Sequence, residues 1–274
     1  MNYKLICIDL DGTLLDNDCQ ISEKNKAALK AAVDKGIRIA FTTGRMFTSA
    51  RLHASKAGIN VSIIGSNGAY IREIDGEKAI FERPLDRQGF DKICDVIERY
   101  KLDINFNTFD RVITDYELPP TNNHVLANKT VSEELKIKFG VHKNLREIYD
   151  IYEEGLLKVL MFSKNGKETI KKARKELEEF DGLEISSSKA DNLEVMTKGM
   201  TKGTGIRALA RILGISQEEI MCIGDSENDI SMFNAAGLKV AMGNATEELK
   251  AMADYVTDTN INSGVGKAIE KFIL

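Results

Sequence analysis

LICIDLDGTL, residues 5–14, combines the pattern of a buried strand with two closely spaced carboxylates, and it is the most informative segment of this chain. Its first four residues are apolar and predict a buried strand, after which Asp9 and Asp11 follow one residue apart and lead into Gly12. Two carboxylates at the end of a hydrophobic strand repel each other unless a cation or a reacting group lies between them. Asp-Gly pairs also form ordinary solvated turns. The stretch therefore predicts a catalytic or metal-binding loop, with a plain turn as the alternative.

The residues around this stretch alternate between short apolar strands and helices. Glycines just after the helices, such as Gly36 and Gly58, fit left-handed helix caps, and strands that are apolar throughout fit a sheet covered on both faces. Asp75-Gly76, between two short apolar segments, predicts a hairpin. The expected strands are 4–9, 37–42, 61–64, 220–223 and 238–241, and the expected helices are 23–35, 46–57, 203–213, 228–235, 246–252 and 265–273.

The middle of the chain breaks this rhythm. Two helices, at 87–101 and 167–179, and four strands, near 104–106, 111–114, 157–162 and 183–186, occur there together with a polar stretch that reaches to about 150. Strands and helices in that order are typical of an α+β unit. We therefore predict an α/β protein with a doubly wound, mainly parallel Rossmann-like core formed by residues 1–83 and 194–274, interrupted by an α+β cap at residues 84–193.

Composition narrows the class of protein. The 274 residues are 43% apolar and 29% charged with a formal charge of -4, which gives no electrostatic reason to bind nucleic acid or an anionic membrane. Residues 1–4 lack the long apolar segment expected of a signal peptide, and the later apolar runs are too short to span a bilayer. Its four cysteines are scattered without a C-x-x-C pair, so we interpret them as reduced. We expect a cytoplasmic protein, and the oligomeric state stays open.

Polar residues follow the expected core strands at four places. These are the Asp9 and Asp11 loop, Thr42-Thr43-Gly44-Arg45, Lys202-Gly203, and the segment 224–229, which reads GDSEND. Ligands of open α/β sheets bind beyond the carboxyl ends of the strands, so the four places predict one site. The acidic segment offers the oxygen ligands that Mg²⁺ requires. Ordinary helix N-termini, which favour hydroxyl caps and acidic residues, are the alternative for the second and fourth places.

In this order, with a cap between the second and third places, the segments resemble the haloacid dehalogenase superfamily of phosphohydrolases, and more narrowly its Cof-type members. The resemblance covers essentially the whole chain and rests on D-x-D-G-T-L, T-G-R, K-G and G-D-x-x-N-D. It implies that Asp9 is a nucleophile that forms an aspartyl-phosphate, and that Asp11 is the general acid and base. It also implies that Mg²⁺ binds to Asp9, the Asp11 carbonyl and Asp225, with Asp229 supporting it directly or through water.

The same resemblance assigns the phosphate ligands. Thr43, the Gly44 and Leu10 N–H groups, Lys202 and Asn228 would hold the transferring phosphoryl oxygens. Arg45, Asn67, Asn192 and Lys198 lie near these segments in the sequence, so they are candidates for facing the substrate, although each could instead satisfy a turn or a hinge.

Two other patterns carry less weight. Residues 203–208 fit G-x-G-x-x-A but follow a lysine instead of a strand, so we do not interpret them as a dinucleotide site. His53, His124 and His142 are isolated, with no partner at ligand spacing, and we interpret them as surface or satisfied histidines.

Together these features predict a Mg²⁺-dependent phosphomonoesterase with a small phosphorylated metabolite as its substrate. Sugar phosphates are the leading class by resemblance. A phosphomutase or other phosphotransferase of the same superfamily is the alternative enzyme, and a metal- or phosphate-binding regulator without activity is the alternative of another class.

Overall fold

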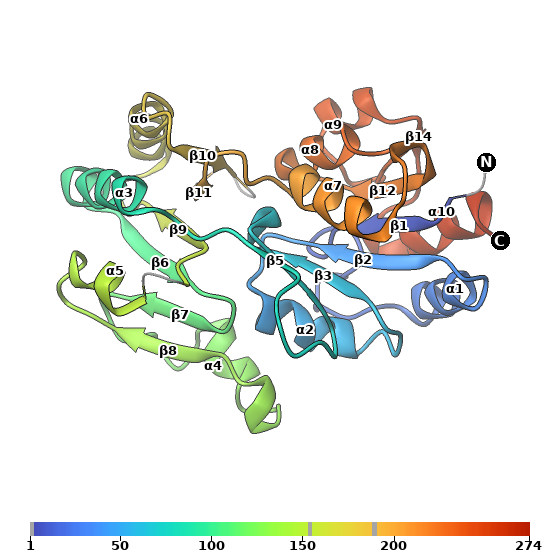
Figure 1. Ribbon diagram of the computed structural model, residues 1–274, viewed down its shortest axis with the longest axis horizontal. Helices are drawn as coiled ribbons and strands as arrows, with labels where there is room; N and C mark the ends of the chain where they lie inside the picture. Colours follow the sequence, from blue (N-terminus) through green and yellow to red (C-terminus); the bar gives the residue numbers. More distant parts are fainter. Residues whose placement is uncertain (1–2, 153–154, 188–190) are drawn as a thin grey trace.

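The computed structural model describes residues 3–152, 155–187 and 191–274. Within these residues the chain forms two lobes, each built on its own sheet, and both termini lie on the larger lobe (Figure 1). No helix in the described part of the chain is long and apolar enough to cross a membrane.

The larger lobe, which we call the core, is built on a mainly parallel sheet with the strand order β14-β13-β12-β1-β2-β3-β4-β5. The six strands from β14 to β3 run parallel, and β4 and β5 are antiparallel. This arrangement confirms the predicted mainly parallel α/β core. The strands are β1 Leu5–Ile8, β2 Arg38–Thr42, β3 Ser62–Gly65, β4 Tyr70–Glu73, β5 Phe81–Glu82, β12 Ile220–Gly224, β13 Leu238–Ala241 and β14 Tyr255–Val256.

Helices cover both faces of the core sheet, with α7, α8 and α9 on one side and α1 and α2 on the other (Figure 1). The central strands are buried along their whole length, which explains why they read as continuous apolar runs. The helices are α1 Glu23–Asp34, α2 Phe47–Ser55, α7 Lys202–Leu213, α8 Ile230–Phe233, α9 Glu247–Met252 and α10 Gly264–Phe272.

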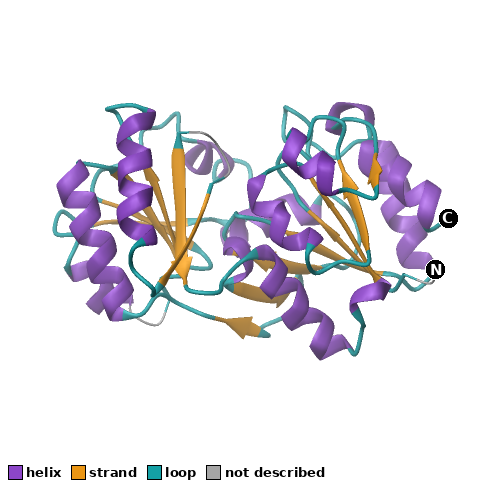
Figure 2. Ribbon diagram, turned by 90° about the horizontal axis from the view of Figure 1, so that it is seen from above, coloured by secondary structure: helices purple, strands orange, loops and turns teal. Residues whose placement is uncertain are grey.

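The smaller lobe, which we call the cap, is built on a sheet with the strand order β10-β11-β9-β6-β7-β8. Helices α3 and α6 pack against each other on one side of this sheet, and Figure 2 shows the two lobes side by side. The strands are β6 Asp103–Asn107, β7 Arg111–Thr114, β8 Lys138–Val141, β9 Lys158–Phe162, β10 Leu183–Ser186 and β11 Asn192–Thr197. The helices are α3 Arg87–Tyr100, α4 Asn123–Ala127, α5 Glu147–Tyr152 and α6 Lys167–Glu178.

Strand β11 differs from the sequence prediction. It pairs antiparallel with both β10 and β9, so it lies inside the cap sheet, whereas a core that resumes at residue 194 would divide it. Only residues 192–195 alternate between polar and apolar types, which is too short a period-2 pattern to predict a strand from the sequence. We propose that the chain returns to the core after Thr197 instead of at 193/194.

The two lobes contact each other directly. The Thr48 N–H at the start of α2 donates to the Phe109 carbonyl of the cap over 3.0 Å, and the rings of Tyr70 and Phe109 stack with centroids 5.5 Å apart. On another side, Arg174 of α6 forms a 2.9 Å ion pair with Glu227 of the core. The cap sheet is therefore held over the edge of the core where the parallel strands end.

Candidate active site

The two carboxylates that open the site come from neighbouring strands. Asp9 directly follows β1 and Asp225 directly follows β12, and these strands pair parallel with Ile8 opposite Ile223. Because parallel strands end at the same edge of the sheet, residues more than 200 positions apart in the sequence meet there. Asp9 is buried, with 3% of its surface exposed.

Gly12 and Thr13, which follow Asp11, both lie directly against the side chain of Asp225. Gly12 has φ +81°, and a Cβ at this position would lie 2.5 Å from Asp225 Oδ2. A larger residue would thus be strained by its backbone and would also collide with the carboxylate. The next residue, Thr13, donates its hydroxyl to Asp225 Oδ1 over 2.8 Å.

Lys202 lies at the first turn of α7, where Thr201 caps the helix, and it is 1% exposed. Its Nζ donates to Asp9 Oδ1 and to Asp229 Oδ1, both at 2.7 Å. Burial alone would lower the pKa of Lys202, but Asp229 and Asp9 outweigh it and raise the pKa above its ordinary value. Lys202 is therefore a fixed cation beside the proposed nucleophile.

Three carboxylates gather around this lysine. One oxygen of each of Asp9, Asp225 and Asp229 lies within 4.8 Å of the others. Burial raises the pKa of Asp9 well above its ordinary value; Lys202 opposes that shift, and Asp229 and Asp225 add to it. Burial and Asp229 likewise raise the pKa of Asp225 to about 6. One lysine does not neutralise this cluster, and an all-oxygen donor set suits a hard divalent cation, so these residues fit a metal ion.

Asp229 also orders the loop. While Oδ1 accepts from Lys202, Oδ2 accepts from the backbone N–H groups of Asp225 (2.8 Å) and Ser226 (3.0 Å). These bonds place Asp225 at the edge of the site. Asp229 is completely buried and does not line the cavity, which favours support of a metal from behind.

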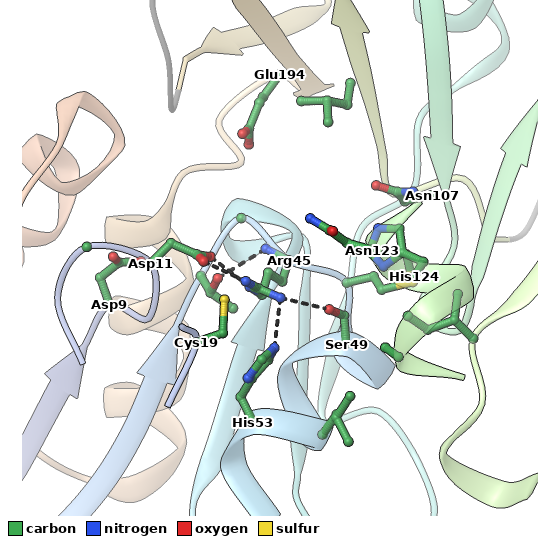
Figure 3. A pocket seen from close by; sticks show the side chains of 18 of the residues that line it. Asp9, Asp11, Cys19, Arg45, Ser49, His53, Asn107, Asn123, His124 and Glu194 are labelled. Atoms are coloured by element: carbon green, nitrogen blue, oxygen red, sulfur yellow. Dashed lines mark hydrogen bonds and ion pairs between the residues drawn. The ribbon is translucent and has the colours of Figure 1, made fainter. Parts of the chain in front are cut away.

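Arg45, in the loop after β2, forms a bidentate ion pair with Asp11. Its Nε and one terminal nitrogen donate to the two Asp11 carboxylate oxygens at 2.7 and 2.6 Å, as Figure 3 shows. Burial raises the pKa of Asp11, but these two bonds outweigh it, so the pKa lies below its usual value. Asp11 is thereby held as a carboxylate on the cavity wall.

Ser49 and His53 support Arg45 from α2. Arg45 Nη1 lies 3.3 Å from Ser49 Oγ and 2.9 Å from His53 Nε2. Burial, then Arg45 and Lys56, lower the pKa of His53 to about 4, so the imidazole is neutral and accepts from Arg45. Of the two alternatives predicted for His53, a surface or a satisfied histidine, the structure shows the second, because the ring is buried and hydrogen-bonded to Arg45. The spacing of Arg45, Ser49 and His53 at intervals of four is the signal that could have connected them.

A cavity of about 970 Å³ lies between the core and the cap. Its core wall includes Asp9, Asp11, Asp225 and Lys202. Its cap wall combines apolar side chains, among them Ile137, Leu160 and Phe162, with polar ones. Of the polar residues, only Asn192 was a sequence-based candidate for facing the substrate. The polar residues are Asn107, Asn123, His124, Lys158, Asn192 and Glu194.

Most of the predicted core residues come together here. Thr43, Gly44, Arg45 and Asn228 line the same cavity, and Leu10 is buried beside Asp9. Two of the residues proposed to face the substrate do not line it. Asn67 is buried and donates instead to Glu194 of the cap, at 2.6 Å. Lys198 lies on the exposed surface next to Asp181, 3.4 Å away, because β11 carries it past the cavity.

The chain is similar in sequence to known hydrolases and phosphatases over its whole length. A model of haloacid dehalogenase-like hydrolases matches residues 6–269. A Bacillus subtilis protein named as a 5-amino-6-(5-phospho-D-ribitylamino)uracil phosphatase is 32% identical over 275 residues, which cover 100% of this chain and 97% of that protein.

Solved structures extend the comparison. A haloacid dehalogenase-like hydrolase from B. subtilis superposes with a TM-score of 0.86 and 30% identity, covering 99% of this chain and 100% of the other. A sugar phosphatase of haloacid dehalogenase subclass IIB superposes with a TM-score of 0.76 and 28% identity, covering 98% and 99%. The chain therefore belongs to the haloacid dehalogenase-like hydrolase family and is a phosphatase that hydrolyses phosphoric monoesters.

Proposed function

We propose that this protein hydrolyses a small phosphorylated metabolite, with sugar phosphates favoured, in a Mg²⁺-dependent reaction through an aspartyl-phosphate on Asp9. The observation that carries the proposal is the position of Asp9. Its carboxylate is buried at the bottom of the cavity, 2.7 Å from Lys202 and beside Asp225 and Asp229.

In the first step, a carboxylate oxygen of Asp9 attacks phosphorus and the bond from phosphorus to the ester oxygen breaks. The leaving alcohol takes a proton from Asp11, which lines the same cavity. Splitting the reaction at an aspartyl-phosphate divides one difficult displacement into two easier ones.

In the second step, Asp11 removes a proton from water, the water oxygen bonds to phosphorus, and the bond to Asp9 breaks to release phosphate. Arg45 favours the ionised form of Asp11, which is the form that this step requires. Protonated Asp11, needed in the first step, forms only when Arg45 releases the carboxylate. We expect substrate binding to draw Arg45 away, because a phosphate dianion competes for the same guanidinium.

Asp9, the Asp11 carbonyl and Asp225 would hold Mg²⁺, with Asp229 supporting them. When bound, the ion would neutralise the carboxylates and withdraw charge from the phosphoryl group. The all-oxygen cluster and the raised pKa of Asp9 support this assignment. We further propose that Thr43, the Leu10 and Gly44 N–H groups, Lys202 and Asn228 bind the phosphoryl oxygens.

The side chains on the cap side of the cavity indicate which class of substrate could bind there. Amide, imidazole, lysine and glutamate side chains line it beside the apolar Leu160 and Phe162, and the polar groups can bind hydroxylated molecules. A sugar phosphate fits this lining. The phosphorylated ribitylaminouracil named for the B. subtilis relative also carries hydroxyl groups and belongs in the same test.

The decisive experiment measures phosphate release from sugar phosphates, polyol phosphates and p-nitrophenyl phosphate with Mg²⁺ and with EDTA. We expect release only with Mg²⁺, and a loss on the order of 10⁴-fold or more in Asp9→Asn, because the amide is not a competent nucleophile. Asp34→Asn, on the exposed end of α1, is the matched control and keeps full activity.

Release that persists in Asp9→Asn would contradict the proposed nucleophile. Analysis of the products separates hydrolysis from transfer. Free phosphate equal to the substrate consumed supports the hydrolase, whereas a new phosphorylated sugar would support a phosphotransferase.

A further inference from the structure

The cap sheet has two different faces. Along β9, Val159 and Met161 pack into the apolar interior of the cap, while Lys158, Leu160 and Phe162 line the cavity. Side chains of a strand alternate between the two faces of the sheet. This alternation decides which residues of β9 face the core and which face the interior of the cap. In the same way, β11 sends Leu193 and Val195 into the cap and Asn192 and Glu194 into the cavity, and Asn107 of β6 joins them.

Lys158 and Glu194 form an ion pair on this cavity face. Lys158 Nζ and Glu194 Oε2 are 3.0 Å apart, and each side chain is only 5% exposed. Burying a charged pair costs desolvation energy that apolar residues at the same positions would avoid. The other β9 residues that face the cavity, Leu160 and Phe162, are apolar. Packing of the cap alone therefore does not explain why a charged pair is present at this position.

The pair rests on the loop that carries the proposed phosphate ligands. Lys158 donates to the Gly44 carbonyl, and Asn67 of the core donates to Glu194 Oε2 over 2.6 Å. A Cβ on Gly44 would lie 2.9 Å from Glu194 Oε2 and 3.5 Å from Lys158 Nζ. Because the Gly44 N–H is one of the proposed phosphate ligands, a phosphoryl group bound there would lie on the same loop that both charges contact.

We propose that Lys158 and Glu194 are specificity-determining residues that bind a hydroxyl group near the phosphoester of a polyol or sugar phosphate. This inference rests on the proposed function. A hydroxyl group can accept a hydrogen bond from an ammonium group and donate one to a carboxylate, so it can bind between the two ends of such a pair. An unsubstituted alkyl chain satisfies neither charge, and the pair discriminates against it.

The test compares two substrates with the same five-carbon chain. Ribitol 5-phosphate carries hydroxyl groups along the chain, and n-pentyl phosphate carries none. We expect the wild type, with Mg²⁺, to favour ribitol 5-phosphate in kcat/KM by about 10- to 100-fold, which is the effect of one or two charge-assisted hydrogen bonds. In Lys158→Met and in Glu194→Gln this ratio should fall to within about threefold of one.

Lys164→Met is the matched control. Lys164 lies on the same lobe, pairs with Asp103 at 2.8 Å and is 82% exposed, so the substrate ratio should stay at its wild-type value. Thermal melting verifies that each variant folds. Glu194→Gln keeps the size of the side chain and serves if Lys158→Met does not fold.

Three results would overturn the inference. One is a wild-type ratio near one, which needs no variant. Another is a ratio that stays high in both folded variants although their activities fall, because the pair would then only hold the cap on the core. The last is a wild type that releases phosphate from neither ester nor from p-nitrophenyl phosphate, which would remove the proposed function as well. The first two outcomes leave the proposed function intact.

Discussion

The two walls of the cavity are built on different principles. The core wall consists of loops at the ends of parallel strands, and each loop supplies several site residues in a row, such as Asp9 and Asp11 or Asp225 and Asn228. The cap wall is the face of an antiparallel sheet, where each strand supplies every second residue, such as Lys158 on β9 and Glu194 on β11.

This difference follows from how the two sheets are covered. A parallel sheet is packed with helices on both faces, so only its edge is open to a ligand, and the chemistry concentrates there. An antiparallel sheet needs helices on one face only, and α3 and α6 leave the other face of the cap to the cavity. We therefore expect the core wall to set the reaction for every substrate and the cap wall to set which substrate is preferred.

Lys202→Met should have the largest effect of the next three changes. It removes the buried cation that contacts Asp9 and leaves three carboxylates without their lysine, so we expect kcat/KM to fall by about 10²- to 10³-fold on every substrate alike. Lys198→Met, at an exposed lysine outside the cavity, is the control and should change nothing. If Lys202→Met altered the order of substrates, the division between the two walls would be wrong.

Gly12→Ala tests the close approach inside the core loop. The new Cβ would meet Asp225 Oδ2 at 2.5 Å, whereas at Gly36, with a similar φ of +83°, no atom lies within 4 Å. Both variants should lose about 1 kcal/mol of stability through backbone strain, but only Gly12→Ala should also lose activity, by roughly tenfold or more. Urea unfolding and phosphate release measure the two effects, and equal activity in both variants would argue against the contact.

His53→Gln should have the smallest effect on activity of the three, and its main effect should be on the pH dependence of stability. The pKa of His53 is lowered to about 4 in the folded protein, below its unfolded value near 6.5. Between these values the unfolded chain binds a proton that the folded protein does not, so stability falls as the pH falls through this window. Urea unfolding at pH 7 and pH 4.5 should show a loss about 1–3 kcal/mol smaller in His53→Gln.

His124 of the cap gives the comparison for that measurement. Burial lowers its pKa to about 4 as well, but the side chain is only partly buried. We expect His124→Gln to flatten the pH dependence less than His53→Gln does. An effect of His124→Gln equal to or larger than that of His53→Gln would show that His124 is shielded from water at least as strongly as His53.

The secondary structure was predictable where the sequence pattern was local. The central core strands and the helices at 87–101 and 167–179 were found because each has an uninterrupted apolar run or a clear helical period. The polar stretch up to about 150 hid α4, α5 and β8, and β11 was missed for a related reason. In these segments the pairing of distant strands, such as Arg111 with Lys138 in β7 and β8, fixes the structure, and local sequence carries little of that information.

The core wall could be predicted from the sequence alone, because Asp9, Lys202 and Asp225 lie in short motifs whose residue types suit their proposed chemistry. The remaining contacts of the site arise from tertiary packing. It brought Glu194 to Asn67 and Lys158 to Gly44, moved Lys198 out of the site, and joined His53 to Arg45. The physical reason is that these contacts depend on strand register and on the seating of one lobe on the other. No single segment of the sequence determines the strand register or the relative position of the two lobes.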